Sequence, residues 1–225
     1  MAVRDLKLKE FSDRYFSPLD EELGLQRSHN EEEQVPLILT ETEGILRLLL
    51  SYTKPDNILE IGTAHGYSAL FFAKYLPHAH IRTIERNPAM AAIAKENFAA
   101  FEEGARIEMF EGDALEILQS FLDSNDFNNE NDKFDFVFID AAKSHYREFL
   151  EIAEKMCKKN ALIVCDNVLL KGWIVEPVGS DAKRHRTNIK YMRQFLDYIK
   201  EREDLDVTYL TGGDGLAIIK LNNDK

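Results

Sequence analysis

The hydrophobic and polar positions of the chain change their pattern at about residue 55. From there on, short apolar runs alternate with segments in which apolar residues recur at helical spacing. The runs, which have the length of buried strands, are NILEIG, HIRTIE, RIEMFEG, FDFVFID and ALIVCD. The segments between them, predicted as helices, are YSALFFAKYL, NPAMAAIAKENFAAF, ALEILQSFL and SHYREFLEIAEKMCK. Such alternation predicts a parallel sheet with helices on both faces.

The part of the chain before residue 55 is predicted to be helical and acidic. HNEEEQ (29–34) is expected as a polar break, and the helix in TETEGILRLLLSY is expected to begin at Thr40 or Thr42, where the side chain can cap it. The residues expected on the apolar face of that helix are Ile45, Leu48, Leu49 and Tyr52.

The end of the chain breaks the alternation in another way. After a predicted helix around 184–203, the apolar runs DVTYL and GLAIIKL are separated only by TGGDG. So short a glycine-rich link predicts an antiparallel hairpin. FLDSNDFNNENDK (121–133) is interpreted as a polar surface loop. We expect one α/β domain, with an N-terminal helical cap (1–54) and a core (55–221).

Composition narrows the class of protein. The chain has 225 residues, of which 44% are hydrophobic and 30% charged, which suits one sizeable α/β domain. No apolar run approaches the roughly 20 residues of a membrane span, and the N-terminus lacks the apolar core of a signal peptide, so we expect a cytoplasmic protein. Cys157 and Cys165 have no metal-site spacing, and Cys165 is expected to be buried.

The segment EIGTAHG follows a predicted strand and opens a predicted helix. Its glycines, Gly62 and Gly66, have the spacing G-x-x-x-G, whereas the dinucleotide fingerprint is G-x-G-x-x-G. A nicotinamide dehydrogenase is therefore disfavoured. A turn of this kind brings a ligand close to backbone amide groups, although it can also be a plain tight turn.

Polar residues also follow the next two predicted strands. The second ends at Glu85-Arg86, where a carboxylate can accept hydrogen bonds from both ribose hydroxyls, and the third at Gly112-Asp113-Ala114, beside a possible adenine. A nucleoside without a diphosphate suits this pattern, and S-adenosylmethionine is the obvious cofactor. Glu60 would then complement its cationic end and Ser68 its carboxylate.

The fourth and fifth predicted strands end in carboxylates. Asp140 ends the fourth, and Asp166-Asn167 end the fifth, so these side chains should converge at one edge of a parallel sheet. Two carboxylates and an amide oxygen suit Mg²⁺ or another hard divalent cation better than zinc. The alternative is that both aspartates merely cap turns.

Lys143, three residues after Asp140, is the predicted catalytic residue. A hard metal beside a methyl donor indicates a hydroxyl acceptor with a neighbouring oxygen, because both oxygens can then chelate the metal. Lys143 can take the hydroxyl proton or hold the oxyanion, and it can equally be a solvated lysine at a helix start. His65, His145 and Trp173 either line the pocket or have turn, surface and packing roles.

Together these residues resemble the class I methyltransferases of the catechol and caffeoyl-CoA O-methyltransferase family, over about residues 35–221. The segments that carry the resemblance are EIGTAHGYSA, TIERN, GDA, FIDAAKSHY and CDNVLLKG. It implies a Rossmann-like fold with a mainly parallel seven-stranded sheet and a C-terminal antiparallel hairpin. The cofactor residues that match are Ile38, Leu39, Glu60, Gly62, Ser68, Glu85, Arg86, Gly112, Asp113, Ala114 and Asp140. The matching metal ligands are Asp140, Asp166 and Asn167, and Lys143 matches the catalytic lysine.

Within the family the chain is most similar to bacterial tRNA 5-hydroxyuridine methyltransferases, through DNVLLKG, a basic cluster and GDGLAIIK. This resemblance implies methylation of 5-hydroxyuridine to 5-methoxyuridine in the anticodon loop, and a homodimer. The alternatives are a small catechol-like or hydroxycinnamoyl-CoA acceptor, and a cofactor-binding protein without catalysis.

The basic cluster bears on the tRNA prediction because the chain as a whole has a net charge of −12. Residues 171–193 contain six basic and two acidic residues. We expect phosphate contacts through this segment, with Arg186, Lys190 and Arg193 close to one helical face. A solvated loop and helix start is the alternative.

Overall fold

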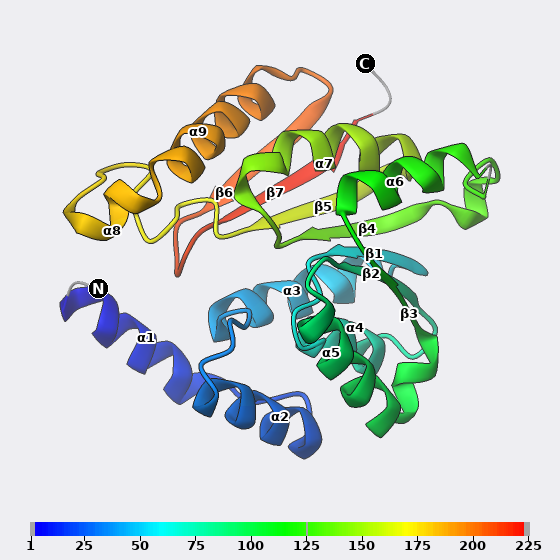
Figure 1. The fold of residues 1–225 in the computed structure, drawn as a ribbon, viewed down its shortest axis with the longest axis horizontal. Coiled ribbons are helices and arrows are strands. Elements are labelled where there is room, and N and C mark those ends of the chain that lie inside the picture. Colours follow the sequence, from blue (N-terminus) through cyan, green and yellow to red (C-terminus); the bar gives the residue numbers. More distant parts are fainter. Residues whose placement is uncertain (1–2, 125, 223–225) are drawn as a thin grey trace. The chain divides into compact units, whose positions relative to one another are not determined.

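The computed structural model describes residues 3–124 and 126–222 (Figure 1). The chain divides into two compact units, Met1–Ile117 and Leu118–Lys225. Each unit has its own strands and helices and is described by itself. The expectation of one domain with a cap and a core stays a prediction.

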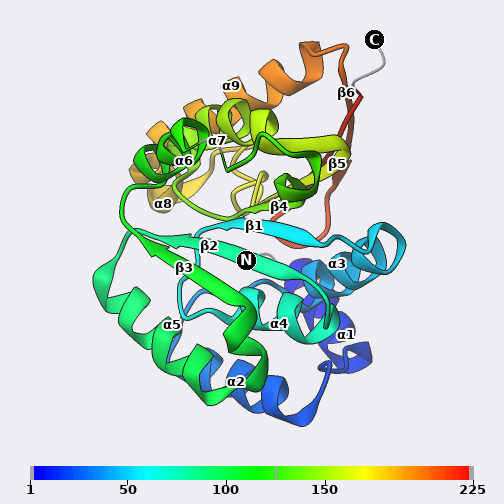
Figure 2. The same ribbon diagram turned by 90° about the vertical axis from the view of Figure 1, so that its right-hand side faces the viewer.

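Three parallel strands form the sheet of the first unit. They are β1 (Asn57–Ile61), β2 (His80–Glu85) and β3 (Ile107–Glu111), in the order β3-β2-β1 (Figure 2). Ile58 of β1 lies opposite Ile81 of β2 in the register. The strands are where the apolar runs predict them, because each run is just long enough to cross a buried sheet.

Two helices pack against β2 and β3: α4 (Tyr67–Tyr75) and α5 (Pro88–Ala100). The Asn87 side chain accepts a hydrogen bond from the Ala89 N–H (3.0 Å), and Pro88 occupies the first turn, as expected for a helix start. A short 3₁₀ helix (Glu102–Arg106) leads into β3.

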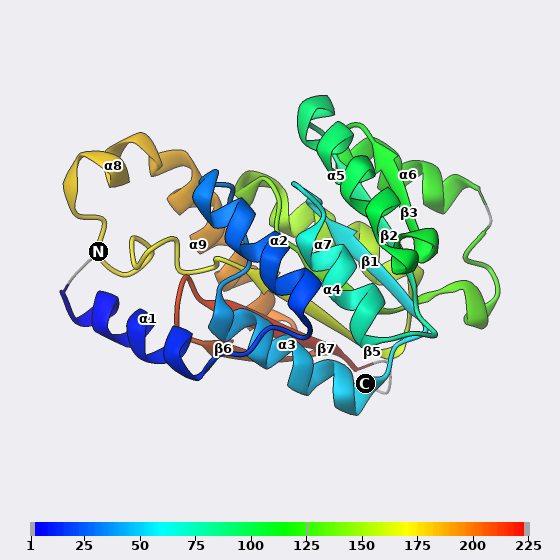
Figure 3. The ribbon, with the colours of Figure 1, turned by 90° about the horizontal axis from the view of Figure 1, so that it is seen from below.

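The N-terminal segment folds into three helices: α1 (Val3–Tyr15), α2 (Glu21–Glu32) and α3 (Thr40–Thr53). The α2 helix contacts α4 and runs beside it (Figure 3). It includes most of HNEEEQ, so the prediction of a break beginning at 29 is wrong: the helix ends at Glu32. At the other end of α2, the Asp20 carboxylate accepts a hydrogen bond from the Leu23 N–H (2.9 Å) and so caps the helix.

The predicted orientation of α3 is also wrong. The helix begins after Leu39 and has no side-chain cap. Leu48 and Tyr52, expected on the apolar face, are 55% and 82% exposed, while Leu46 and Leu50 are buried. The helix is rotated because its buried face also carries a carboxylate with partners of its own.

That carboxylate is Glu43, which is fully buried. It accepts hydrogen bonds from Arg27 Nη2 (2.8 Å), Arg47 Nη2 (2.6 Å) and the Tyr67 hydroxyl (2.8 Å). Burial without partners would be strongly unfavourable for each charge, so the network fixes α3 against α2 and the start of α4. Burial, above all, raises the pKa of Tyr67, so its hydroxyl remains a donor.

Four strands form the sheet of the second unit, in the order β4-β5-β7-β6. β4 (Phe134–Ile139) and β5 (Cys157–Asp166) are parallel, whereas β7 (Leu216–Leu221) is antiparallel to both β5 and β6 (Leu205–Leu210). With the three strands of the first unit, this confirms the predicted fold class: seven strands, mainly parallel, with a C-terminal antiparallel hairpin and helices packed on them.

The helices of the second unit follow the strands. The α6 helix (Ala114–Asp123) begins in the first unit and ends here, and the others are α7 (Tyr146–Ala153), α8 (Gly179–Arg184) and α9 (Arg186–Glu201), with short 3₁₀ helices at Glu130–Asp132, Lys143–His145 and Glu154–Met156. The prediction that one helix spans SHYREFLEIAEKMCK is wrong at both ends. Its last residues join β5, because Cys157 pairs with Phe134 in the sheet.

The polar insertion 121–133 is anchored by one apolar residue. Phe127 is 7% exposed and its ring lies 5.8 Å from that of Phe121 and 5.0 Å from that of Phe134. The predicted loop is wrong at its start, because α6 continues to Asp123, and its end contains the short helix Glu130–Asp132; the rest has a buried contact at Phe127. Residue 125 lies outside the described residues.

Both cysteines are buried, as expected for Cys165, and they are free thiols. Among residues 3–124 and 126–222, none of the helices combines the length and apolarity that crossing a bilayer requires.

Candidate active site

The glycine turn of the first unit has the backbone that its sequence predicts. Gly62 has φ 105° and Gly66 has φ 84°, a region that side chains disfavour. A Cβ at Gly66 would also meet the Phe98 ring of α5 at 2.4 Å. The turn is closed by a hydrogen bond from the Gly66 N–H to the Thr63 carbonyl (2.8 Å). Gly66 is therefore required for the close passage of this turn over α5, and Gly62 for the backbone conformation at the end of β1.

Glu60 and Ser68 are brought together, but as partners of each other. Glu60 is fully buried and accepts hydrogen bonds from the Ser68 hydroxyl and from the Thr83 hydroxyl (2.5 Å). The carboxylate thus links β1, β2 and the start of α4. Its predicted role toward the cationic end of a cofactor, and that of Ser68 toward a carboxylate, stay predictions.

Glu85, at the end of β2, holds the glycine turn from the other side. Its Oε2 accepts from the Ala64 N–H (2.8 Å) and its Oε1 from the Asn87 N–H (2.7 Å). Its carbonyl accepts from the Gly112 N–H (2.9 Å). The ends of β1, β2 and β3 are therefore joined around this one residue.

The end of β3 carries the other predicted cofactor residues of the first unit. Gly112 has φ 146°, and Asp113 accepts a hydrogen bond from the Leu115 N–H (3.0 Å) at the start of α6, next to Ala114. Arg86 is 76% exposed, with one guanidinium nitrogen 3.9 Å from an Asp113 carboxylate oxygen. The three strand ends that the sequence singled out thus lie together in this unit.

The segment before α3 is near the same turn, through residues that the sequence pattern did not indicate. Ile38 is buried and its carbonyl accepts from Arg27 Nη2 (3.1 Å), and Leu39 is the cap position of α3. Asn30 of α2 is 1% exposed; its Oδ1 lies 3.1 Å from Nδ1 of His65, and its Nδ2 is buried without a partner. Asn30 went unnoticed because HNEEEQ was interpreted as a solvated break.

In the second unit, Lys143, the predicted catalytic residue, lies in a 3₁₀ turn after β4. Its Nζ donates to Asp140 Oδ1 (2.7 Å) and to the Tyr146 hydroxyl (2.7 Å). The Tyr146 hydroxyl in turn donates to the backbone carbonyl of Asp166 (2.9 Å). Burial, followed by the charge of Asp140, raises the pKa of Tyr146 well above its usual value, so this hydroxyl stays protonated. Tyr146 therefore ties the ends of β4 and β5 together.

Asp166 is the most unusual group of this cluster. It is 2% exposed; its Oδ1 accepts from the Asn167 N–H (2.6 Å), while its Oδ2 is buried without a partner. Burial and then the neighbouring charge of Asp140 raise the pKa of Asp166 to about 7. Asn167 has φ 57°, a left-handed conformation that asparagine tolerates. A buried carboxylate oxygen without a donor is a place where a cation is favourable.

The residues present suit a hard cation by their chemistry. The donors are oxygens from two carboxylates and one amide, and the unpartnered Asp166 Oδ2 has unused acceptor capacity. In the part of the chain that the structure describes, no three His, Cys, Asp or Glu side chains are grouped as metal ligands, and the set of Asp140, Asp166 and Asn167 stays a prediction.

Asp214 is a fourth acidic group that sequence reasoning missed, because TGGDG was interpreted only as the hairpin turn. The turn is held against the loop after β5, where the N–H groups of Val168 and Leu169 donate to the carbonyls of Gly215 (3.0 Å) and Asp214 (2.9 Å). Burial raises the pKa of the Asp214 carboxyl, and the charges of Lys171 and Lys143 oppose that rise. Asp214 therefore lies within electrostatic reach of Lys143.

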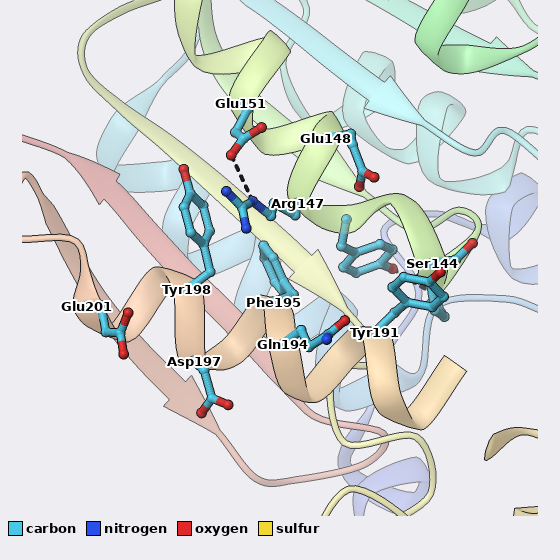
Figure 4. Close-up of a pocket in the computed structure, with 12 residues that line it drawn as sticks. Ser144, Arg147, Glu148, Glu151, Tyr191, Gln194, Phe195, Asp197, Tyr198 and Glu201 are labelled. Carbon is cyan, nitrogen blue, oxygen red and sulfur yellow. Dashed lines mark hydrogen bonds and ion pairs between the residues drawn. The ribbon is translucent and has the colours of Figure 1, made fainter. Parts of the chain in front are cut away.

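A groove of about 590 Å³ lies between α7 and α9 (Figure 4). Lys143 and Tyr146 are among the residues that line it. Arg147 of α7 donates to Glu151 (2.8 Å), and its guanidinium lies 4.2 Å from the ring centre of Tyr198 of α9. The other acidic residues of the lining are Glu148, Asp197 and Glu201. The groove is thus acidic and aromatic.

A second groove, of about 660 Å³, lies along the first half of α9. Its lining includes Arg186, Lys190 and Arg193, which the sequence placed close to one helical face, together with Tyr191. Arg193 also donates two hydrogen bonds to the Ile174 carbonyl (2.9 and 2.6 Å). Three of the six basic residues of segment 171–193 thus line one groove, which Asp197 also lines.

Comparison with known proteins assigns the class of protein. The family model for O-methyltransferase matches residues 15–221, so the chain belongs to the O-methyltransferase family. Catechol O-methyltransferase of Niastella koreensis is 31% identical over 183 residues, which cover 78% of each protein.

Solved structures extend the likeness to nearly the whole chain. A Staphylococcus aureus protein assigned as a caffeoyl-CoA O-methyltransferase has a TM-score of 0.81 at 30% identity and covers 98% of this chain and 100% of its own. TomG of Streptomyces achromogenes, an O-methyltransferase of tomaymycin synthesis solved in complex with SAM, has a TM-score of 0.79 at 26% identity, covering 99% and 100%.

Proposed function

We propose that this O-methyltransferase moves the methyl group of S-adenosylmethionine to a hydroxyl that has a neighbouring oxygen. One observation carries the proposal: Lys143 Nζ is hydrogen-bonded to Asp140 and to Tyr146, in a cluster whose buried Asp166 keeps an unpartnered oxygen. An ammonium group held in this way suits stabilisation of the oxyanion that the acceptor hydroxyl becomes when it loses its proton, as O-methyl transfer requires. The alternative of a binding protein without catalysis leaves this cluster unexplained.

The first unit supplies the residues proposed to hold the cofactor. We assign the ribose to Glu85 and Arg86, the adenine to Gly112, Asp113 and Ala114, and the methionine end to Gly62, Glu60, Ser68, Ile38 and Leu39. Asp140 is also proposed as a cofactor residue, on the family resemblance alone. The joined ends of β1, β2 and β3 support these roles, since they fix three predicted contacts in one unit. TomG, which binds SAM, supports the choice of cofactor.

Asp140, Asp166 and Asn167 are proposed to hold Mg²⁺ or another hard divalent cation. When bound, such an ion would lower the pKa of the acceptor hydroxyl and stabilise the oxyanion. Lys143 receives the hydroxyl proton or holds the oxyanion as an ammonium group, and Tyr146 fixes the position of its Nζ. Methyl transfer itself needs mainly positioning of the two reactants.

For the acceptor, we propose 5-hydroxyuridine in the tRNA anticodon loop, which would become 5-methoxyuridine. Its 5-hydroxyl and 4-oxo groups are neighbouring oxygens. The basic groove on α9 supports an RNA substrate, because Arg186 and Lys190 are exposed cations in a chain with a net charge of −12. Such a local concentration of positive charge is what phosphate contacts require.

A second candidate acceptor is a small catechol-like or hydroxycinnamoyl-CoA compound. The observation that favours it is the naming of the relatives: the Niastella koreensis protein is a catechol O-methyltransferase, and the Staphylococcus aureus protein is assigned to caffeoyl-CoA. The chemistry at Lys143 would be the same.

We also propose that the protein works as a homodimer. Large apolar side chains are exposed in the first unit, among them Phe11 (63%), Tyr15 (69%) and Tyr52 (82%), and a second copy could cover them. Multi-angle light scattering measures this directly, and a monomer at micromolar concentration would contradict it.

The acceptor is tested by incubating the purified protein with labelled S-adenosylmethionine and Mg²⁺. The substrates are tRNA that carries 5-hydroxyuridine, the same tRNA with unmodified uridine, catechol and caffeoyl-CoA. We expect label only in the first tRNA, and loss of transfer when EDTA is added. Transfer to catechol or caffeoyl-CoA alone would establish the second candidate, and transfer to none of them would contradict the proposed function.

A further inference from the structure

Trp173 and His185 stack on each other at the surface of the second unit. Their ring centres are 5.1 Å apart and their planes differ by 19°. Trp173 is partly exposed and His185 is exposed. The first ring lies in the loop after Asn167 and the second between α8 and α9. A partly exposed pair of stacked rings leaves ring surface on which another flat group can stack.

Basic residues are near the pair in space or in sequence, with Asp181 3.8 Å from one of them, Arg184. The Lys171 ammonium lies 5.9 Å from the Trp173 ring centre, and Lys183, Arg184 and Arg186 flank His185 in the sequence with exposed side chains. Aromatic rings among cations are how many proteins hold single-stranded nucleic acid, because bases stack on the rings while the cations attract phosphates.

The loop that carries Trp173 is held firmly. Arg193 donates two hydrogen bonds to the Ile174 carbonyl (2.9 and 2.6 Å), and the Trp173 N–H donates to the Leu170 carbonyl (3.0 Å). Gly172 has φ 81°, which this turn requires. A ring fixed by its backbone loses little conformational freedom when a ligand binds, so it is suited to recognition.

The position of the loop in the chain also matters. It begins at Asn167, one of the proposed metal ligands, and Trp173 is six residues further on. Six residues span at most about 20 Å, so the ring pair lies within a few nucleotides of the proposed reaction centre. A base next to the target nucleotide is therefore a suitable occupant.

We propose that Trp173 and His185 form a stacking platform for an unpaired RNA base that neighbours the methylated nucleotide. The proposal rests on the tRNA acceptor proposed above and names the contact that would recognise the loop. The exposed apolar residues nearby, Val175 (79%) and Val178 (65%), are also compatible with a membrane surface. The paired flat rings favour a base over lipid, and α8, with 6 residues, is too short for an interfacial helix.

The sequence allows a direct test, because Trp173 is the sole tryptophan of the chain. Its fluorescence therefore reports on this platform alone. The probes are an anticodon stem–loop RNA with unmodified uridine, polyphosphate as an anion without bases, and vesicles of phosphatidylcholine with phosphatidylglycerol. We expect quenching by the RNA and little change with the other two. Equal quenching by polyphosphate, or a blue shift with vesicles only, would overturn the proposal.

Variants separate stacking from charge. In an anisotropy titration with labelled stem–loop RNA, Trp173→Ala and His185→Ala should each raise Kd by about 5- to 100-fold. The slope of log Kd against log salt concentration should not change, because no phosphate contact is lost. Trp173→Phe should restore most of the affinity. Tyr209→Ala, at an aromatic residue that is 41% exposed on β6, is the matched control and should bind normally. Binding by Trp173→Ala within twofold of wild type would refute the platform.

The two proposals fail in different ways. If the unmodified RNA binds and quenches but 5-hydroxyuridine is never methylated, the platform stands and the proposed acceptor is wrong. If 5-hydroxyuridine is methylated equally well by Trp173→Ala, with unchanged KM and Kd, the acceptor stands and the platform is wrong.

Discussion

At the scale of single residues, Lys143 is the side chain on which the proposed reaction depends most. Lys143→Ala should lower kcat by about 10²- to 10⁴-fold, the usual contribution of a positioned acid or base, and should leave cofactor affinity unchanged. Steady-state kinetics and calorimetric titration with S-adenosylhomocysteine measure the two effects. Lys155→Ala, at an exposed lysine of the same unit, is the control. A fully active Lys143→Ala enzyme would remove the proposed role.

Asp166 has a consequence for stability because its pKa is raised to about 7. In the unfolded chain the carboxyl ionises near its usual value, so between about pH 4 and pH 7 the folded state holds a proton that the unfolded state has released. Stability contributed by this group is therefore lost as pH rises through 7. In EDTA at pH 8, Asp166→Asn should raise Tm by at least about 4 °C, and at pH 4.5 by much less.

The comparison for that experiment is the wild-type protein at pH 8 with Mg²⁺ in place of EDTA. Its Tm should also rise, because an ion that binds the folded state stabilises it. An Asp166→Asn variant that melts earlier than wild type at pH 8 in EDTA would contradict the interpretation that Asp166 is an unfavourably buried charge. Activity should be lost at either pH.

At the scale of elements, the buried network around Glu43 fixes the N-terminal helices. Glu43→Gln removes the charge that compensates Arg27, which is itself 6% exposed, so unfolding free energy should fall by about 3–5 kcal/mol. Glu31, which is 57% exposed and 3.6 Å from the same guanidinium, provides the matched control. Glu31→Gln should change stability by less than about 1 kcal/mol. Equal effects of the two variants in urea unfolding would contradict the structure of this network.

The glycine turn gives a second prediction at this scale. Gly66→Ala puts a Cβ against the Phe98 ring in a backbone conformation that alanine disfavours, so the turn must move. We expect lower affinity for S-adenosylhomocysteine, by about tenfold or more, and a lower Tm. Gly44→Ala is the control: no atom lies within 4 Å of its Cβ, and alanine favours a helix, so this variant should be at least as stable as wild type. Unchanged cofactor affinity in Gly66→Ala would show that the turn does not hold the cofactor.

The sequence predicted the strands well and the N-terminal helices poorly, for a physical reason. A strand end is marked by a short apolar run followed by polar residues. This pattern is local in the sequence and does not depend on contacts with distant residues. The buried face of α3 is decided instead by Glu43 and its partners, and hydrophobic spacing carries no sign of a buried ion pair. The end of α7 was predicted too late, because Cys157 pairs with Phe134 in the sheet and so belongs to β5.

The same distinction applies to the site. Asp140 and Asp166 were predicted because they stand at the ends of strands, and Lys143 because it is three residues after Asp140; chain order brings such residues to one edge. Tyr146 and Asp214 were not, since their roles arise from contacts made after folding: the first spans two strand ends and the second arrives with a hairpin turn.

At the scale of the whole molecule, charge is distributed very unevenly. Residues 171–193 have an excess of positive charge in a chain whose net charge is −12. Changing Lys183, Arg184 and Arg186 together to Glu should weaken tRNA binding strongly and reduce its salt dependence, because fewer counterions are released. The same change at Lys155, Lys159 and Lys200 is the control for net charge. Catechol methylation, if present, should be the same in both triple variants as in the wild type. An unchanged tRNA affinity in the first variant would contradict the proposal that these basic residues bind tRNA.

The central claim is that the methyl group is transferred to a tRNA hydroxyl. The most direct measurement is mass analysis of tRNA nucleosides from cells with and without this gene, and from cells in which Lys143→Ala replaces the wild-type protein. We predict that 5-methoxyuridine disappears and 5-hydroxyuridine accumulates both without the gene and with the variant. Unchanged tRNA nucleosides in both strains would contradict the account and indicate a small-molecule acceptor.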